Sequence, residues 1–175
     1  MRLYRDLVKQ ARTPLFYRDL GVPDTPEGRF EMVGLHVALV VRRLRGAGVP
    51  GRALAQELFD LMFADIDESL RHIGVGDLSV GKHVKRLAGN FYARLRALDQ
   101  ALEARPRAPL AAILRTNMYH GGSAPSPHQL DVLVSYLLAA EAALRAHATG
   151  HLLAGDVDWA PPEAPQNQNV LREHE

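Results

Sequence analysis

Residues 59–86 read FDLMFADIDESLRHIGVGDLSVGKHVKR and decide the fold of this chain. The first half is strongly apolar but carries four acidic residues, whereas the second half is basic. The residues concerned are Asp60, Asp65, Asp67 and Glu68, then the glycines Gly74, Gly76 and Gly81, then Lys82, Lys85 and Arg86. Apolar residues recur at helical spacing on both sides of the glycines, and glycine clusters interrupt helices. The stretch therefore predicts a charge-polarised hairpin of two helices joined by a glycine turn, with Asp77 or Ser79 capping the second helix.

Helical spacing of apolar residues extends outward from this hairpin in both directions, and strand alternation is hard to find. We expect helices over residues 3–12, 15–20, 25–45, 51–72, 77–102, 108–119 and 126–144. After Gly155 the sequence is rich in proline and poor in apolar side chains, which favours an irregular tail with Trp159 and Val170 as possible anchors. The predicted fold is an all-α, single-domain bundle of about six to seven helices over residues 1–154, followed by an irregular tail over residues 155–175.

Both ends of the helix over residues 25–45 carry recognisable signals. At its start, Asp24 and Thr25 offer capping oxygens, and Glu27 completes an Asp-x-x-Glu capping arrangement. At its end, three arginines between residues 42 and 45 precede two glycines. Cations near C-terminal carbonyls favour helix termination, so we expect these arginines to stabilise the end of their own helix.

The composition bounds the function. The chain has 175 residues, a net charge of +1 and no cysteine, so disulfides, thiol catalysis and cysteine-ligated metals are excluded. It lacks the basic excess of a dedicated nucleic-acid binder. The N-terminus lacks the apolar core of a secretory signal, and the longest apolar stretch, Met32–Val41, is about half of the roughly 20 residues that a bilayer crossing needs. We expect a cytoplasmic protein, peripheral at most to the inner face of a bacterial membrane.

Asp65 occupies an unexpected position within the hairpin. At about 100° per residue it falls inside the apolar arc of its helix, whereas Asp60 and Asp67 point to the opposite side. Since burial of an unpaired carboxylate is costly, we expect Asp65 to pair with a backbone amide of the glycine turn or with a cation on the following helix. Two roles remain open, a structural anchor of the turn or a catalytic acid, and the structural role is favoured. The residues assigned to the structural turn are Asp65, Gly74, Gly76, Asp77 and Gly81.

A basic stripe follows on the second helix of the hairpin. Its residues fall within about 100° of arc, opposite Phe91. Such stripes are usually solvent faces, and the functional alternative is a docking surface for anionic lipid headgroups, RNA or an acidic partner. The candidate partner-binding residues are Lys82, Lys85, Arg86 and Arg96.

Eight histidines raise the question of a metal or haem site. His147 and His151 stand four residues apart, but a Thr-Gly pair that ends a helix lies between them. His36 lies at the apolar centre of its helix, where a lone histidine is more often a hydrogen-bonded core residue than a ligand. No zinc-protease motif, phosphate loop, dinucleotide fingerprint or nucleophile elbow occurs. We therefore predict no catalytic residue, no metal and no cofactor.

Three sequence blocks together form a family pattern. The first is FYRDLGVPDT over residues 16–25, followed by GRFEM over residues 28–32. The second and most distinctive comprises DLMFADID over residues 60–67, GVGD over residues 74–77 and VGK over residues 80–82. The third comprises RTNMY over residues 115–119 and the helix from Ser126. Over residues 12–145 the chain resembles the ubiquinol–cytochrome c chaperone family.

The resemblance implies a non-enzymatic assembly factor for the cytochrome bc1 complex, which in mitochondrial relatives works with a small helical partner to receive newly made cytochrome b. The chain begins almost at the domain, which suits an alphaproteobacterial member. The implied partners are cytochrome b or another bc1 assembly protein, with peripheral contact to membrane or ribosome and no sequence-specific nucleic acid. We expect an apolar groove between helices, rimmed by the stripe from Lys82 to Arg96, to hold a partner helix.

Two alternative functions remain open. The first is a helical module that binds RNA or the ribosome through the basic stripe, which predicts an affinity that falls steeply with salt. The second is a haem-handling protein that uses His36, which predicts a Soret shift lost in His36→Ala.

Overall fold

The computed structural model describes residues 1–72, 74, 76–104, 107–159 and 161–162 of the chain. All regular elements within these residues are helical, and no strand occurs among them. In chain order they are α1 (Arg2–Ala11), α2 (Pro14–Arg18), α3 (Pro26–Leu44), the 3-10 turn η1 (Arg45–Ala47), α4 (Gly48–His72), α5 (Asp77–Ala104), α6 (Arg107–Met118), α7 (Pro127–Ala146) and α8 (Thr149–Leu153). Six of these helices have ten residues or more, and the prediction of an all-α bundle is confirmed.

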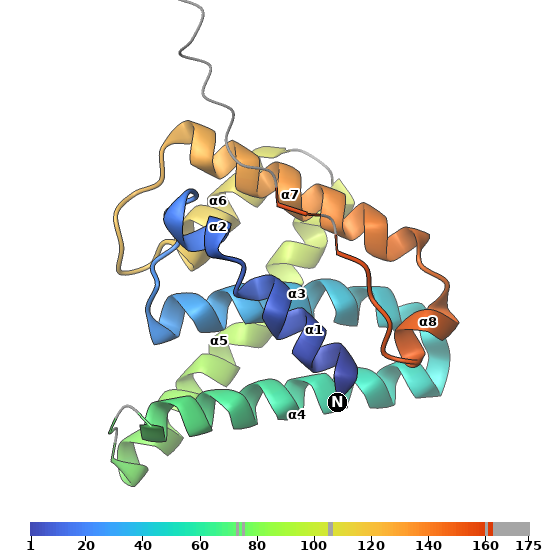
Figure 1. Ribbon diagram of the computed structural model, residues 1–175, viewed down its shortest axis with the longest axis horizontal. Helices are drawn as coiled ribbons and strands as arrows, with labels where there is room; N and C mark the ends of the chain where they lie inside the picture. Colours follow the sequence, from blue (N-terminus) through green and yellow to red (C-terminus); the bar gives the residue numbers. More distant parts are fainter. Residues whose placement is uncertain (73, 75, 105–106, 160, 163–175) are drawn as a thin grey trace, which may run out of the picture.

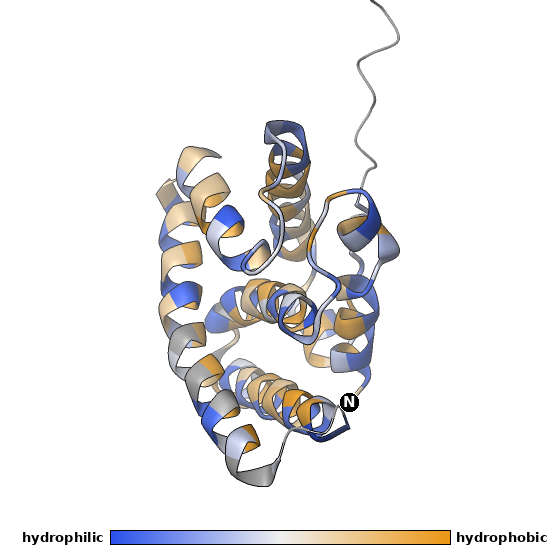
Figure 2. Cartoon of the chain, turned by 90° about the vertical axis from the view of Figure 1, so that its left-hand side faces the viewer, coloured by the Kyte–Doolittle hydropathy of each residue, from blue (hydrophilic) through white to orange (hydrophobic). Residues whose placement is uncertain are grey.

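The helix α3 lies at the centre of the bundle. In Figure 1, α4 runs along the lower edge and α7 along the upper edge, with α3 between them and α1 crossing in front. α3 contacts α1, α4, α5, α6 and α7, and its residues Met32, Val37 and Val40 are fully buried. Figure 2 shows the apolar faces of the surrounding helices turned towards this centre. A helix that is apolar on all sides is stable only inside a core, so the prediction of a central helix is confirmed.

Two glycines of α3 allow closer packing than any side chain would permit. A Cβ atom at Gly34 would come within 2.9 Å of the Phe91 ring on α5. A Cβ atom at Gly28 would lie 2.0 Å from the carbonyl oxygen of Pro23. Because packed interiors leave no room for such overlaps, a side chain at either position would push the neighbouring segment away from α3.

The start of α3 is capped by one residue rather than by a capping box. The Thr25 Oγ1 accepts a hydrogen bond from the Gly28 amide at 3.1 Å. Asp24 instead accepts from the Arg29 Nε at 2.6 Å, so the predicted Asp24-x-x-Glu27 arrangement is wrong. A complete capping box is present at α7, where Ser126 and Gln129 each satisfy the other's backbone amide.

The arginines at the end of α3 bind to other helices rather than to their own. Arg43 donates to the carbonyl oxygens of Leu144 and His147, which lie at the C-terminal end of α7, where the helix itself supplies no donors for the last carbonyls. Arg42 and Arg45 both pair with Asp99 of α5. α3 ends within this run of arginines, as predicted, but their guanidinium groups bind carbonyl and carboxylate groups of other helices. They stabilise α7 and link α3 to α5, while η1 leads directly from α3 into α4.

The hairpin predicted from residues 59–86 is formed by α4 and α5, which meet at the lower left of Figure 1. Gly74 has a φ of +84°, a left-handed conformation that favours glycine. The Gly76 carbonyl accepts hydrogen bonds from the amides of Ser79 and Val80, so α5 begins directly after Gly76. Ser79 and Gly81 lie within α5, and the prediction that Gly81 belongs to the turn is wrong.

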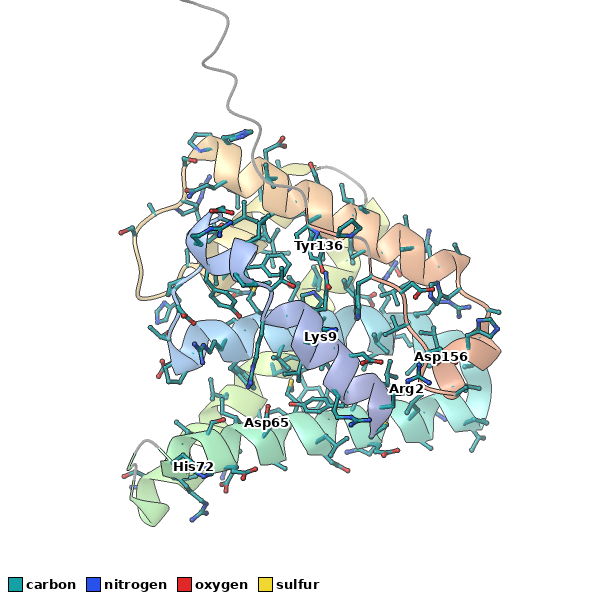
Figure 3. The ribbon with its side chains drawn as sticks, in the orientation of Figure 1. Arg2, Lys9, Asp65, His72, Tyr136 and Asp156 are labelled. Carbon is teal, nitrogen blue, oxygen red and sulfur yellow. The ribbon has the colours of Figure 1, made fainter. Side chains whose placement is uncertain are left out.

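The segment after α8 returns to the body of the molecule. Asp156 pairs with Arg2 at 3.0 Å, and Figure 3 shows the two side chains close together. The Trp159 ring packs edge-on against His36, with ring centroids 4.9 Å apart. The prediction that Trp159 anchors this segment is confirmed, whereas Val170 lies outside the described residues. The short helix α8 was not predicted from the sequence.

Candidate functional site

A groove lies between α1, the first half of α3 and the second half of α4, with a volume of about 520 Å³. Its apolar floor is formed by side chains that are themselves buried: Phe30, Val33, Met62, Ile66 and Leu70. Polar residues surround this floor: Tyr4, Arg12, Asp24, Thr25, Arg29, Asp65, Ser69 and His72. An apolar floor with a polar border is typical of sites that accept apolar side chains while orienting them by their polar neighbours.

Asp65 forms one wall of this groove. Its Oδ2 accepts a hydrogen bond from the Tyr4 hydroxyl at 3.0 Å, and the Arg12 guanidinium lies 3.9 Å from the same oxygen. Figure 3 shows Asp65 on α4, just below α1. Burial, together with the charge of Asp65, raises the pKa of the Tyr4 hydroxyl, which therefore stays protonated and donates.

The partners of Asp65 differ from those expected. We predicted a backbone amide of the glycine turn or a cation on the following helix, and both are wrong, because the partners come from α1 and from the residue after it. The Asp65 side chain is 38% exposed, so it is less buried than its helical position suggested. Asp65 thus anchors the N-terminal helix to α4.

A second hollow continues from the first. It has a volume of about 490 Å³ and shares Arg12, Asp24 and Arg29 with the groove. Its other lining residues are Pro14, Tyr17 and Arg18. The hydrogen bond from Arg29 holds the pKa of Asp24 below its usual range, so Asp24 is ionised at neutral pH. With three arginines and one aspartate, this hollow favours anions.

The basic stripe lies elsewhere. Lys82, Lys85 and Arg96 are exposed on α5, whereas the side chain of Arg86 lies outside the described part of the chain. Lys82, Lys85 and Arg96, the stripe residues whose side chains are described, do not line this groove, so the expectation that the stripe forms the rim of the groove does not hold for these three. Tyr92 lies on the same face of α5, is 47% exposed and contacts Phe59 of α4.

Of the residues assigned to the turn, Asp65 lines the groove, whereas Gly74, Gly76 and Gly81 do not. Gly74 and Gly76 form the link between α4 and α5, and no side chain is described for Asp77. His72, at the end of α4, lines the groove and bonds the Glu68 carbonyl oxygen through its Nδ1 at 2.9 Å. The groove therefore reaches the turn only at its edge.

His36 is fully buried and hydrogen-bonded through both ring nitrogens. Its Nδ1 lies 2.7 Å from the Met32 carbonyl oxygen and must donate, which leaves Nε2 to accept from the Tyr136 hydroxyl at 2.6 Å. Burial lowers the pKa of His36 to about 4, so the ring is neutral at physiological pH. The prediction of a hydrogen-bonded core residue is confirmed, and neither nitrogen is open to a haem or metal ion.

The described residues contain no group of three or more histidine or carboxylate side chains placed to hold a metal ion. No helix of this part of the chain is long and apolar enough to cross a membrane. His147 bonds the Asp158 amide and lies 3.5 Å from the Asp158 carboxylate, so it ties the end of α7 to the C-terminal segment.

Sequence reasoning found Asp65 but missed the residues around it. Tyr4 and Arg12 belong to the N-terminal segment and lie more than fifty positions from Asp65, so no local spacing could indicate their contact. Arg18 and Arg29 belong to the first block of the family pattern. That block indicated a shared role in the family but not that these arginines would lie beside the groove.

Known proteins share the sequence pattern and the fold of this chain. A family model described as ubiquinol-cytochrome C chaperone matches residues 18–159. A solved structure of the Cbp3 homolog from Brucella abortus superposes with a TM-score of 0.81 at 40% identity, covering 91% of this chain and 87% of that one.

Curated relatives agree with this match. Ubiquinol-cytochrome c reductase complex assembly factor 1 is 26% identical in Mus musculus and 25% identical in Homo sapiens, over 99% of this chain. The chain spans only 59% and 58% of the length of those two relatives. The Xenopus laevis relative of the same name is 24% identical over 98% of this chain and 86% of its own length. The chain belongs to the ubiquinol-cytochrome C chaperone family.

Proposed function

We propose that this protein is a non-enzymatic factor in the assembly of the ubiquinol–cytochrome c reductase complex, and that it holds an apolar segment of newly made cytochrome b, or of another assembly protein, in the groove between α1, α3 and α4. The observation that carries the proposal is a surface groove of about 520 Å³ that ends on five buried apolar side chains, in a chain of this family. Helix-in-groove recognition reads a few apolar side chains on one face of the partner.

The energetics of the groove agree with a holding role. Each large apolar side chain that moves from water into the groove contributes about 1.5–3 kcal/mol before the cost of ordering the partner. The groove volume of about 520 Å³ admits only a few such side chains. The groove therefore offers a small apolar contact area, which suits reversible holding of a segment.

Deletion of the gene in its host tests the assembly role directly. We expect loss of the b-type cytochrome spectrum and of quinol–cytochrome c reductase activity, and normal levels of both would refute the role.

Complementation with two phenylalanine variants of α4 then tests the groove. Ser69 lines the groove, so Ser69→Phe fills it, whereas Ala64→Phe adds the same ring at an exposed position of the same helix. We expect Ala64→Phe to restore the complex and Ser69→Phe to fail. Thermal melting of the two purified variants should show that both are folded. Full restoration by Ser69→Phe would show that the client binds to another surface of the protein.

The basic stripe supports a second candidate function, binding to RNA or to the ribosome. Lys82, Lys85 and Arg96 are exposed, as this function requires. A titration separates the two, because RNA affinity falls steeply with salt whereas apolar capture tolerates it.

A further inference from the structure

We infer that the groove selects an apolar peptide segment that carries a carboxylate beside its apolar side chains, and that Arg12 and Arg29 are the residues that recognise this carboxylate. The inference rests on the proposed function, since it concerns the same groove, and it adds the polarity of the segment that the groove accepts.

The two hollows form one surface with two chemical ends. One end is the apolar floor formed by α3 and α4, and the other is the hollow lined by three arginines. Arg12 and Arg29 line both, so they stand where the apolar end passes into the cationic end. A segment that places apolar side chains on the floor therefore brings its next residue to these two guanidinium groups.

Of the three arginines that line the cationic hollow, Arg12 has the most N–H donors without a described hydrogen-bond partner. Its only described partner is Asp65, at 3.9 Å, which is beyond hydrogen-bonding distance. Asp65 is itself satisfied by the Tyr4 hydroxyl at 3.0 Å, so it does not depend on Arg12. A guanidinium carries five donors in a planar fork that fits a carboxylate in a two-point contact.

Arg29 is partly engaged but remains available. Its Nε donates to Asp24, while no described contact occupies its two terminal nitrogens. Both side chains of this pair are about half exposed, and exposed pairs of this kind exchange partners at little cost. Arg18 donates through its Nε and one terminal nitrogen to the two carboxylate oxygens of its neighbour Asp19, so its charge is largely compensated and it has fewer free donors than Arg12.

Charge complementarity thus favours an anionic group at this end. Because the apolar floor adjoins it without a break, we expect that group to belong to a peptide whose apolar side chains lie on the floor. A client with a lysine or arginine at the same place would face two guanidinium groups and one carboxylate, that of Asp24, which already pairs with Arg29, so the net charge there disfavours a cation and lets the groove choose among apolar segments. An anionic acyl lipid shares part of this chemistry and is separated by the experiment.

The probe is a labelled helical peptide of about four turns with leucines along one face. It is made with two glutamates, two glutamines or two lysines at one end, and each set is made for both ends. Fluorescence anisotropy with the full chain measures affinity at low and moderate salt. We expect the glutamate peptide to bind about tenfold more tightly than the glutamine peptide, and the lysine peptide to bind least.

Three variants assign the effect. In Arg12→Gln and Arg29→Gln the ratio of the glutamate-peptide affinity to the glutamine-peptide affinity, measured within each variant, should fall to about threefold or less. Arg52→Gln, an exposed arginine of α4 outside both hollows, should keep the full preference.

The outcomes separate the inference from the proposed function. Equal binding of glutamate and glutamine peptides overturns the inference and leaves the groove as an apolar site. No binding of either peptide overturns both. Displacement of the peptides by phosphatidylglycerol vesicles in wild type but not in Arg12→Gln, with no glutamate preference, would assign the cationic end to lipid and overturn the inference.

Discussion

At the junction of α3 and α7, His36 and Tyr136 are sealed inside the core, whereas at the groove Tyr4 and Asp65 pair at an edge that stays partly exposed. Each site joins a tyrosine hydroxyl to an acceptor on another helix. The sealed pair excludes water and partners alike, and Trp159 covers it from the outside. The open pair leaves room beside it, and the groove lies there.

The difference indicates how polar groups divide between stability and binding. A buried polar group is costly without its partner, so a sealed pair fixes one packing arrangement. A half-exposed pair can exchange its partner for water or for a ligand at little cost. The comparison therefore predicts large stability effects at His36 and Tyr136, and small ones at Tyr4 and Asp65.

The largest expected effect is the pH dependence of stability that His36 produces. In the unfolded chain a histidine has a pKa near 6.5, and burial lowers the pKa of folded His36 to about 4. At pH values between these two pKa values, His36 is protonated in the unfolded state and neutral in the folded state. The free energy of unfolding should therefore fall by about 3 kcal/mol as the pH drops from about 6.5 to about 4.

Urea unfolding at a series of pH values measures this loss. The variant His36→Asn should be less stable than wild type at neutral pH but should lack this pH dependence. The difference between the two free energies of unfolding should therefore become smaller as the pH falls. His72→Asn, at the exposed end of α4, should keep the wild-type slope. An unchanged slope in His36→Asn would show that another group titrates.

The second effect concerns the hydroxyl of Tyr136. Tyr136→Phe leaves the His36 Nε2 without a donor in the core and removes the acceptor used by the Gln10 amide. We expect a loss of about 2 kcal/mol in the free energy of unfolding. The matched variant is Tyr4→Phe, which removes the same hydroxyl at the groove and should cost less than about 1 kcal/mol, because Asp65 can turn to water. Equal losses in the two variants would contradict the comparison.

The third effect belongs to binding rather than to stability. Asp65→Asn keeps an acceptor for the Tyr4 hydroxyl but removes the charge that Arg12 faces. Stability should change by less than about 0.5 kcal/mol, while affinity for the glutamate peptide should rise about threefold, because Arg12 no longer shares its charge. Asp60→Asn, on the outer side of the same helix, is the control. A fall in affinity would mean that Asp65, not Arg12, contacts the peptide.

The sequence indicated some parts of this structure well, and the reason is physical. Apolar spacing and glycines are local signals, so the central helix α3 and the α4–α5 hairpin could be predicted. The contacts of Asp65 depend on where α1 crosses the bundle, and no spacing within residues 59–86 contains that information. The same is true of Arg43, whose position suggested its own helix end but whose guanidinium reaches α7.

The smallest stability effect should come from the basic stripe, and it decides whether the open surface of the protein extends beyond the groove. Charge reversal at Lys82, Lys85 and Arg96 alters only exposed side chains, so the free energy of unfolding should stay within about 0.5 kcal/mol of wild type. If the stripe docks a partner, the reversed protein should fail to restore reductase activity in the deletion strain while still binding the glutamate peptide. Neutral Lys→Gln and Arg→Gln changes at the same positions separate loss of attraction from new repulsion. Full restoration by the reversed protein would assign the stripe to solvent and leave the groove as the surface that acts on the client.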